Sequence, residues 1–89
     1  MQLEALRQAR RRTVGTKQTA KAVERGNAEK VFVARDADER VVRHIIKLCE
    51  ENGVEIQYIE TMSALGKACG IDVGAASAAI LKEEPGSGR

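Results

Sequence analysis

The stretch that decides the fold is VGTKQTAKAVERG at residues 14–26, together with the apolar run VFVA at residues 31–34. Gly15 interrupts the apolar pattern, and the next residue, Thr16, has a side chain that commonly caps the start of a helix. Gly26 stands where a glycine usually ends a helix. A short, continuous apolar run is typical of a strand that is covered on both faces. The sequence therefore predicts a helix that ends at Gly26 and is followed by a buried strand.

Helix and strand patterns alternate along the rest of the chain with short links between them. Helices are expected near residues 3–12, 16–25, 36–52 and 61–69, and strands near residues 13–14, 31–34, 54–59 and 75–81. This alternation predicts an α/β fold, a three-layer α-β-α sandwich around a central mixed sheet of about four short strands. A chain of 89 residues has room for one core. We therefore expect a single domain over residues 1–82 and a flexible polar tail over residues 83–89.

Residues that could carry catalysis are few and have simpler explanations. Asp36 and Asp38 could act as an acid–base pair, but Asp36 and Glu39 have the spacing of a capping box at a helix start. His44 is the single histidine, and it has no partner at metal-ligand spacing. Neither of the glycine-rich phosphate-binding motifs is present. We therefore expect no enzymatic activity, no cofactor and no metal site.

The composition narrows the class of binding protein. Apolar residues make up 43% of the chain, but Phe32 and Tyr58 are its only aromatic residues. A module that stacks bases on a sheet face needs aromatic rings, so this type of RNA reader is disfavoured. Cys49 and Cys69 are expected to be two buried, reduced thiols of a cytoplasmic protein, with a single disulfide as the alternative. No segment approaches the roughly 18–20 apolar residues of a membrane-spanning helix, and arginines interrupt any apolar signal segment near the N-terminus.

The formal net charge of +2 hides an uneven distribution of charge along the chain. Residues 1–30 hold eight basic and three acidic side chains, whereas the other 59 residues hold seven basic and ten acidic ones. Charge that is separated along a sequence usually becomes a charged face after folding, and a positive face attracts polyanions. Arg10, Arg11 and Arg12 are the densest part of this positive region. Alone, they could equally be a solvated helix end.

The predicted helix start at Thr16 carries a second sign of anion binding. The first turn of a helix exposes unpaired backbone N–H groups and a partial positive charge, which attract phosphate groups and electron-rich base edges. Gly15 allows a ligand to approach the backbone closely, while Lys17, Gln18 and Lys21 add donors suited to purine edges. The helix dipole disfavours lysine at this end, so an anionic partner would compensate for the placement.

Four segments together resemble one known family: VGTKQTAKAVERG at residues 14–26, VFVARDA at 31–37, CEENGVEIQYI at 49–59 and LGKACGIDVGAASAAI at 65–80. They resemble the kink-turn-binding ribosomal protein family. This family includes archaeal and eukaryotic large-subunit proteins, the box C/D ribonucleoprotein core protein and small bacterial YbxF-like proteins. The resemblance covers roughly residues 3–82 and implies an RNA-binding protein with an α-β-α sandwich fold.

In this family a Gly-x-Asn-Glu-x-x-Lys segment opens the second helix and reads tandem sheared G·A pairs in the widened groove of a kinked stem. Gly15 and Lys21 match that pattern, whereas Lys17 stands where the family usually has asparagine and Gln18 where it has glutamate. The Lys-Gln pair is similar to the bacterial branch. Gln18 can still accept and donate hydrogen bonds, but it lacks the charge of a carboxylate. The affinity and the base preference are therefore expected to depend on Lys17 and Gln18.

A second element of the family is an apolar loop before the last strand, which covers a nucleotide that is flipped out at the kink. Ile71, Asp72 and Val73 match this loop. Taken alone, Ile71 and Val73 could simply fill the lower part of the core. Beside the helix motif, the resemblance favours a second RNA contact on the same surface.

The resemblance thus implies a cytoplasmic protein that recognises and stabilises kink-turns in structured RNA, and that could be associated with the ribosome. The expected RNA contacts are Gly15, Thr16, Lys17, Gln18, Lys21, Arg25, Ile71, Asp72 and Val73. Arg25 and the run Arg10–Arg12 are expected to add sequence-independent attraction to phosphate. The alternative is a protein–protein adaptor on the same fold, for example a ribosome-associated assembly factor. We expect a monomer with no membrane partner.

Overall fold

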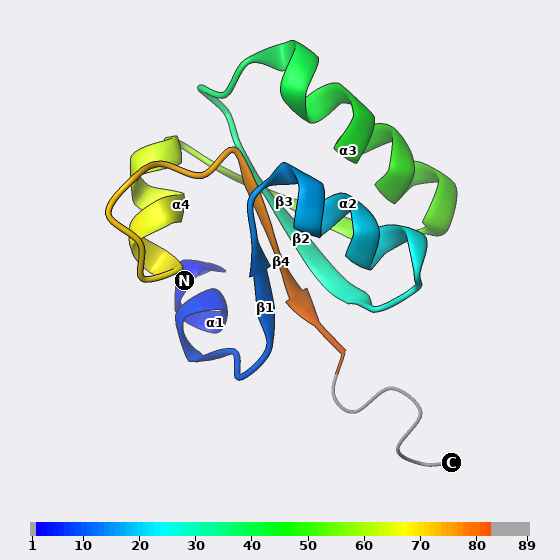
Figure 1. The fold of residues 1–89 in the computed structure, drawn as a ribbon, viewed down its shortest axis with the longest axis horizontal. Coiled ribbons are helices and arrows are strands. Elements are labelled where there is room, and N and C mark those ends of the chain that lie inside the picture. The colour runs from blue at the N-terminus through cyan, green and yellow to red at the C-terminus, as the bar shows by residue number, and fades with distance from the viewer. Residues whose placement is uncertain (1, 83–89) are drawn as a thin grey trace.

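A computed structural model describes residues 2–82 of the chain (Figure 1). The tail expected over residues 83–89 lies outside the described residues. Helices and strands alternate in the order α1 (Gln2–Gln8), β1 (Arg12–Val14), α2 (Thr16–Glu24), β2 (Ala28–Ala34), α3 (Glu39–Asn52), β3 (Glu55–Ile59), α4 (Met62–Ala68) and β4 (Ser77–Leu81). The predicted α/β fold with four short strands is confirmed. Within residues 2–82, no helix is long and apolar enough to cross a bilayer.

The four strands form one mixed sheet in the order β1-β4-β2-β3. Strands β2 and β3 are parallel, whereas β4 runs antiparallel to both of its neighbours, β1 and β2. Consequently β1, β2 and β3 all end at one edge of the sheet, where β4 begins. This edge, formed by Val14, Ala34, Ile59 and Ser77, is termed the upper edge, and the opposite one the lower edge. Helices α2 and α3 cover one face of the sheet, and α1 and α4 cover the other (Figure 1).

The sheet divides the core into two halves because side chains of β2 alternate between its faces. Phe32 is fully buried on the side of α1 and α4, together with Leu6 and Leu65. Val31 is fully buried on the side of α2 and α3, together with Ile45. Both faces of β2 are therefore covered, which accounts for the continuous apolar run in its sequence.

The two cysteines lie in different halves of the core. Cys69 packs on the side of α1 and α4, Cys49 packs on the side of α2 and α3, and both thiols are free. The prediction of two buried thiols is therefore confirmed, and the alternative disulfide is wrong because the sheet lies between them. Burial raises the pKa of the Cys49 thiol to about 11, with the nearby Glu50 carboxylate adding to the effect. Burial also raises the pKa of Cys69, against a smaller opposing influence of Arg12.

The start of α3 lies two residues later than the capping box predicts. Asp38 is the N-cap, and its carboxylate accepts a hydrogen bond of 2.8 Å from the backbone N–H of Arg40. The physical reason is a turn in which the N–H of Ala37 donates to the carbonyl oxygen at the end of β2, so the helix cannot begin earlier. Asp36 instead accepts a hydrogen bond of 2.8 Å from the backbone N–H of Met62 and thereby holds the start of α4.

Candidate nucleic-acid interface

The residue before α2 (Thr16–Glu24) is a glycine, which has no side chain that could cap the helix. Gly15 is the N-cap residue, and its φ of 98° lies in a region that favours glycine. Its N–H donates to the carbonyl oxygen of Ser77 at 2.9 Å, and its own carbonyl accepts from the N–H of Thr19 at 3.0 Å. The prediction that Thr16 caps the helix is therefore wrong, since Thr16 is the first helical residue. Because no side chain accepts at the cap, the N–H groups of the first turn face the upper edge without a side-chain acceptor.

A set of hydroxyl groups fixes this helix start on the sheet. The hydroxyls of Thr13 in β1 and Thr19 in α2 lie 2.9 Å apart. The Ser77 hydroxyl, in the first residue of β4, donates to the hydroxyl of Thr16 at 3.4 Å. Thr19 and Ser77 are both fully buried. Sequence reasoning missed these two residues, although a serine within the small apolar run AASAAI is an available signal for a buried polar contact.

The expected contact side chains of α2 lie on its exposed face. Lys17, Gln18, Lys21 and Arg25 are all exposed, while Thr16 is half-buried. The three cations follow one another at intervals of four residues, which places them along one side of the helix. Within residues 2–82 none of them forms an ion pair. The ion-paired cations are Lys30, Arg35, Arg40 and Arg43, which belong to β2, α3 and the turn between them. The positive charge of α2 is therefore free to meet a ligand.

The loop before β4 is held against α4 by close backbone contacts. A side chain on Gly66 would collide with the carbonyl oxygen of Val73, and one on Gly74 would lie 2.9 Å from Cβ of Met62. The N–H of Ile71 donates to the carbonyl oxygen of Gly66 at 3.1 Å. As a result Ile71 is half-buried against the core, whereas Asp72 and Val73 are exposed. Val73 is 69% exposed, so it does not fill the core.

The loop leads into β4 at the same edge of the sheet at which α2 begins. Gly74 precedes the first residue of β4, Ser77, by three positions, a span of at most about 10 Å. Ser77 in turn receives the hydrogen bond from Gly15. Of the nine residues expected to contact RNA, eight belong to the N-cap and first two turns of α2 or to the loop that leads back along α4 toward the upper edge. Arg25 is the exception, since it is the C-cap of α2 at the other end of the helix.

Arg12 does not belong to the surface cations. Its guanidinium is half-buried between α1 and α4 and donates to the carbonyl oxygens of Leu6, Arg7, Ala9 and Cys69 at 3.2–3.4 Å. Its backbone opens β1, and this explains why α1 ends at Gln8 and not near Arg12 as predicted. The expectation of phosphate attraction by the whole run Arg10–Arg12 is therefore wrong for Arg12. Arg10 and Arg11 remain exposed.

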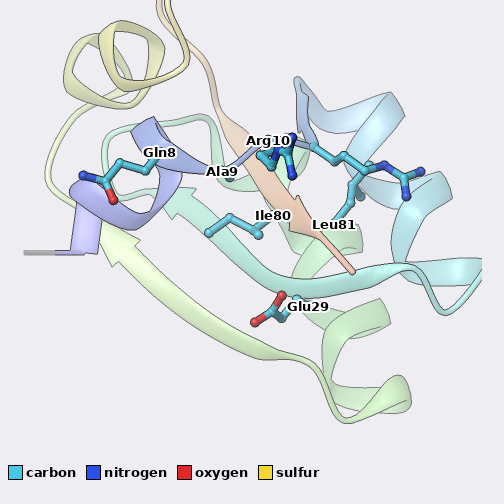
Figure 2. Close-up of a pocket in the computed structure, with 7 residues that line it drawn as sticks. Gln8, Ala9, Arg10, Glu29, Ile80 and Leu81 are labelled. Atoms are coloured by element: carbon cyan, nitrogen blue, oxygen red, sulfur yellow. The ribbon is translucent and has the colours of Figure 1, made fainter. Parts of the chain in front are cut away.

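A cavity of about 530 Å³ opens at the lower edge of the sheet, away from the start of α2 (Figure 2). Its lining residues are Gln8, Ala9, Arg10, Arg11, Glu29, Ile80 and Leu81. Figure 2 shows Arg10 and Glu29 on either side of Ile80. Opposite charges over an apolar floor make this cavity chemically distinct from the upper edge.

Comparison with known proteins finds relatives of this chain. The chain is 55% identical over 69 residues to a protein of Caldanaerobacter subterraneus named as an RNA-binding protein, covering 78% of this chain and 84% of the relative. It is 48% identical over 68 residues to the large ribosomal subunit protein eL8 of Halobacterium salinarum, covering 75% of this chain and 57% of that protein. Among solved structures, the Giardia lamblia 15.5kD RNA binding protein matches with a TM-score of 0.83 and 35% identity, over 93% of this chain and 72% of the other.

The match to a family covers almost the whole chain. The profile of the ribosomal protein L7Ae/L30e/S12e/Gadd45 family matches residues 2–87. That span includes the α2 start, the loop before β4 and all four strands. The chain therefore belongs to the ribosomal protein L7Ae/L30e/S12e/Gadd45 family.

Proposed function

We propose that this protein binds structured RNA and stabilises kink-turns, using the start of α2 and the loop at residues 71–73 as the two contact elements. Relatives named as RNA-binding proteins, one bacterial and one from Giardia, support the class of ligand. The ribosomal relative is compatible with a ribosomal RNA as the target. The protein acts in this proposal by binding alone, without chemistry on the RNA.

One observation carries the proposal. The first turn of α2 presents N–H groups without a side-chain cap, directly beside Lys17 and Lys21, which have no ion-pair partner within the described chain. A helix start of this kind favours anions and electron-rich acceptors. Val73, in the loop that leads toward the same edge, is 69% exposed and offers an apolar contact. Together they fit a ligand with phosphates, base edges and an unstacked base.

The groove geometry of double-helical RNA explains why the proposed ligand must be a bent RNA. The major groove of a regular A-form helix is too deep and narrow for side chains, so Lys17 and Gln18 can reach purine edges only where the helix is distorted. A kink supplies this distortion. A protein that binds only the kinked form shifts the RNA toward it, and moving from about 1% to about 99% kinked requires a roughly 10⁴-fold binding preference.

A gel-shift titration tests specific recognition. The two RNAs are a kink-turn stem and the same stem with its G·A pairs replaced by Watson–Crick pairs. We expect tight binding to the first and at least ten-fold weaker binding to the second. Equal affinity for both, or no binding to either, would contradict the proposal.

A triple variant, Lys17→Ala with Gln18→Ala and Lys21→Ala, tests the contact residues. It should lose binding to the kink-turn while its thermal unfolding stays nearly unchanged, because all three side chains are exposed. The matched control is Arg40→Ala with Arg43→Ala, which also removes two positive charges but from α3. If the control loses as much affinity as the triple variant, net charge and not the helix start governs binding.

A protein–protein adaptor is the second candidate function, and one feature favours it. An apolar groove of about 310 Å³ lies between α3 and β3, lined in part by Val42, Ile46 and Tyr58. Tyr58 is 40% exposed, and its ring lies 5.2 Å from the Arg35 guanidinium. Such a surface can receive a partner side chain. The adaptor function gains support if the titration above shows no preference for the kinked RNA.

A further inference from the structure

The lower edge of the sheet brings together three segments that are far apart in the sequence. The carbonyl oxygen of Arg11 accepts a hydrogen bond of 3.0 Å from the N–H of Leu81, and Nη1 of Arg11 donates to the carbonyl oxygen of Lys82 at 3.5 Å. The N–H of Lys82 donates to the carbonyl oxygen of Asn27 at 2.7 Å. These hydrogen bonds therefore hold the segment before β1, the segment after α2 and the end of β4 together at the lower edge.

Three exposed arginines belong to these segments and are termed the lower basic group: Arg10, Arg11 and Arg25. None of them forms an ion pair within residues 2–82. Arg11 directly precedes β1, and its Nη1 donates to the carbonyl oxygen of Lys82, whose own N–H bonds to Asn27 just after α2. The acidic residue among those that line the cavity is Glu29, which lies on the other side of Ile80 from Arg10 (Figure 2).

The lower basic group is connected to the upper edge by α2 itself. The helix has nine residues, so it is about 14 Å long at 1.5 Å per residue. Lys17, Lys21 and Arg25 follow one another along it, so unpaired cations continue from one end to the other. A backbone charge recurs about every 3.4 Å along one strand of a DNA duplex, which serves as a guide to the spacing in duplex RNA. The helix therefore spans about four nucleotides of a duplex strand.

We propose that the lower basic group binds the phosphate backbone of one helical arm next to the kink, so that the RNA footprint follows α2 from Gly15 down to Arg11. This inference rests on the proposed function, because binding at the kink determines where the arm lies. The ligand is duplex RNA backbone and not a base, so this contact is independent of sequence and weakens as salt rises. Glu29 opposes the contact and limits its strength.

The test compares kink-turn RNAs that differ only in arm length. One has arms of about ten base pairs, well beyond the roughly four nucleotides that α2 spans, and in the others each arm in turn is trimmed to about two. Arg10→Ala with Arg11→Ala should lower the affinity for the long-armed RNA on the order of ten-fold and reduce the salt slope by about 2. Trimming the arm that contacts the lower basic group should abolish the difference in affinity between this variant and the wild type.

A second variant should increase the affinity for the long-armed RNA instead of lowering it. Glu29→Gln removes the opposing carboxylate and should tighten binding to the long-armed RNA, with no change for the RNA whose contacting arm is trimmed. Because Glu29 is exposed, this variant should fold like the wild type. The double variant Arg40→Ala with Arg43→Ala is the control for net charge.

The inference is overturned if Arg10→Ala with Arg11→Ala loses the same affinity for long and trimmed RNAs, or loses none for either. It is also overturned if the α3 control shows the same dependence on arm length. Failure of the proposed function looks different, since the wild type would then bind the kinked stem no better than its Watson–Crick counterpart.

Discussion

Nη2 of Arg12 donates a hydrogen bond of 3.2 Å to the carbonyl oxygen of Cys69, which lies 57 positions later in the chain. The same guanidinium also donates to carbonyl oxygens at the end of α1. Carbonyls at helix C-termini lack partners within the helix, and a cation is favoured there by the dipole. One side chain therefore joins the ends of α1 and α4 and holds the point from which the loop before β4 departs.

Replacing Arg12 by alanine should lower the free energy of unfolding by about 1–3 kcal/mol, because half-buried carbonyl oxygens lose their donor. Arg11→Ala is the matched control and should change it by less than about 0.5 kcal/mol, since the Arg11 side chain is exposed. Urea unfolding followed by circular dichroism measures both. Equal midpoints for the two variants would contradict the assignment of Arg12 to structure.

Sequence patterns predicted those elements whose positions are determined by neighbouring residues. The apolar run of β2, the end of α3 near residue 52 and the position of α2 directly after Gly15 all depend on neighbouring residues, and the structure confirms them. Arg12 and Asp36 were misassigned because their partners are far along the chain. A run of three arginines gives no sign that the third faces the opposite side of an edge strand.

The same limit applies to the candidate site. The exposed positions of Lys17 and Lys21 follow from helical periodicity, and so could be predicted. The role of Ser77 could not, because its contact with Gly15 depends on β4 lying beside β1 in the sheet. This pairing brings together the first and last strands of the sheet, so no pattern among neighbouring residues predicts it.

Gly66→Ala should displace the loop at residues 71–73, because the added methyl group would collide with the carbonyl oxygen of Val73. We expect both a loss of stability of about 1–3 kcal/mol and weaker binding to kink-turn RNA. Val73→Ala should weaken binding while changing stability by less than about 0.5 kcal/mol, because the side chain is exposed. Thermal unfolding and RNA titration of both variants separate the two effects. Unchanged RNA binding in Val73→Ala would exclude the loop from the interface.

The buried thiol of Cys49 should make the protein less stable at alkaline pH. Its pKa is about 11 in the folded protein, above the ordinary value near 9, because burial disfavours the thiolate. The unfolded chain therefore loses this proton first, so the contribution to stability is full below pH 9 and declines as the pH rises toward 11. In Cys49→Ala this contribution is absent, while that of the buried Cys69 thiol remains. Urea unfolding from pH 8 to pH 10.5 should show the difference in stability between wild type and variant shrinking as pH rises, and a constant difference would contradict it.

Lys17→Asn restores the family's residue at the third position of the helix motif. Because it removes one exposed cation that has no ion-pair partner within the described chain, it should reduce the slope of log affinity against log salt by about 1. Stability should rise slightly, since a cation in the first turn of a helix opposes the dipole. Titrations at several salt concentrations measure the slope. A slope equal to that of the wild type would mean that the charge of Lys17 does not lie close to the RNA.

Gln18→Glu restores the family's glutamate and should sharpen the base preference. A carboxylate only accepts hydrogen bonds, whereas the amide of Gln18 both accepts and donates, so glutamate discriminates more strongly for base edges that donate. The measurement compares a kink-turn RNA with the same RNA carrying inosine at the contacted guanine, which removes the exocyclic amino group. We expect a modest loss of affinity for wild type and a larger one, by up to about 1–3 kcal/mol, for Gln18→Glu. Gln18→Ala is the control for any effect of inosine on the RNA itself and should show the smallest loss of affinity. If wild type and Gln18→Glu lose the same affinity, this side chain does not read the amino group, and base preference resides elsewhere on the upper edge.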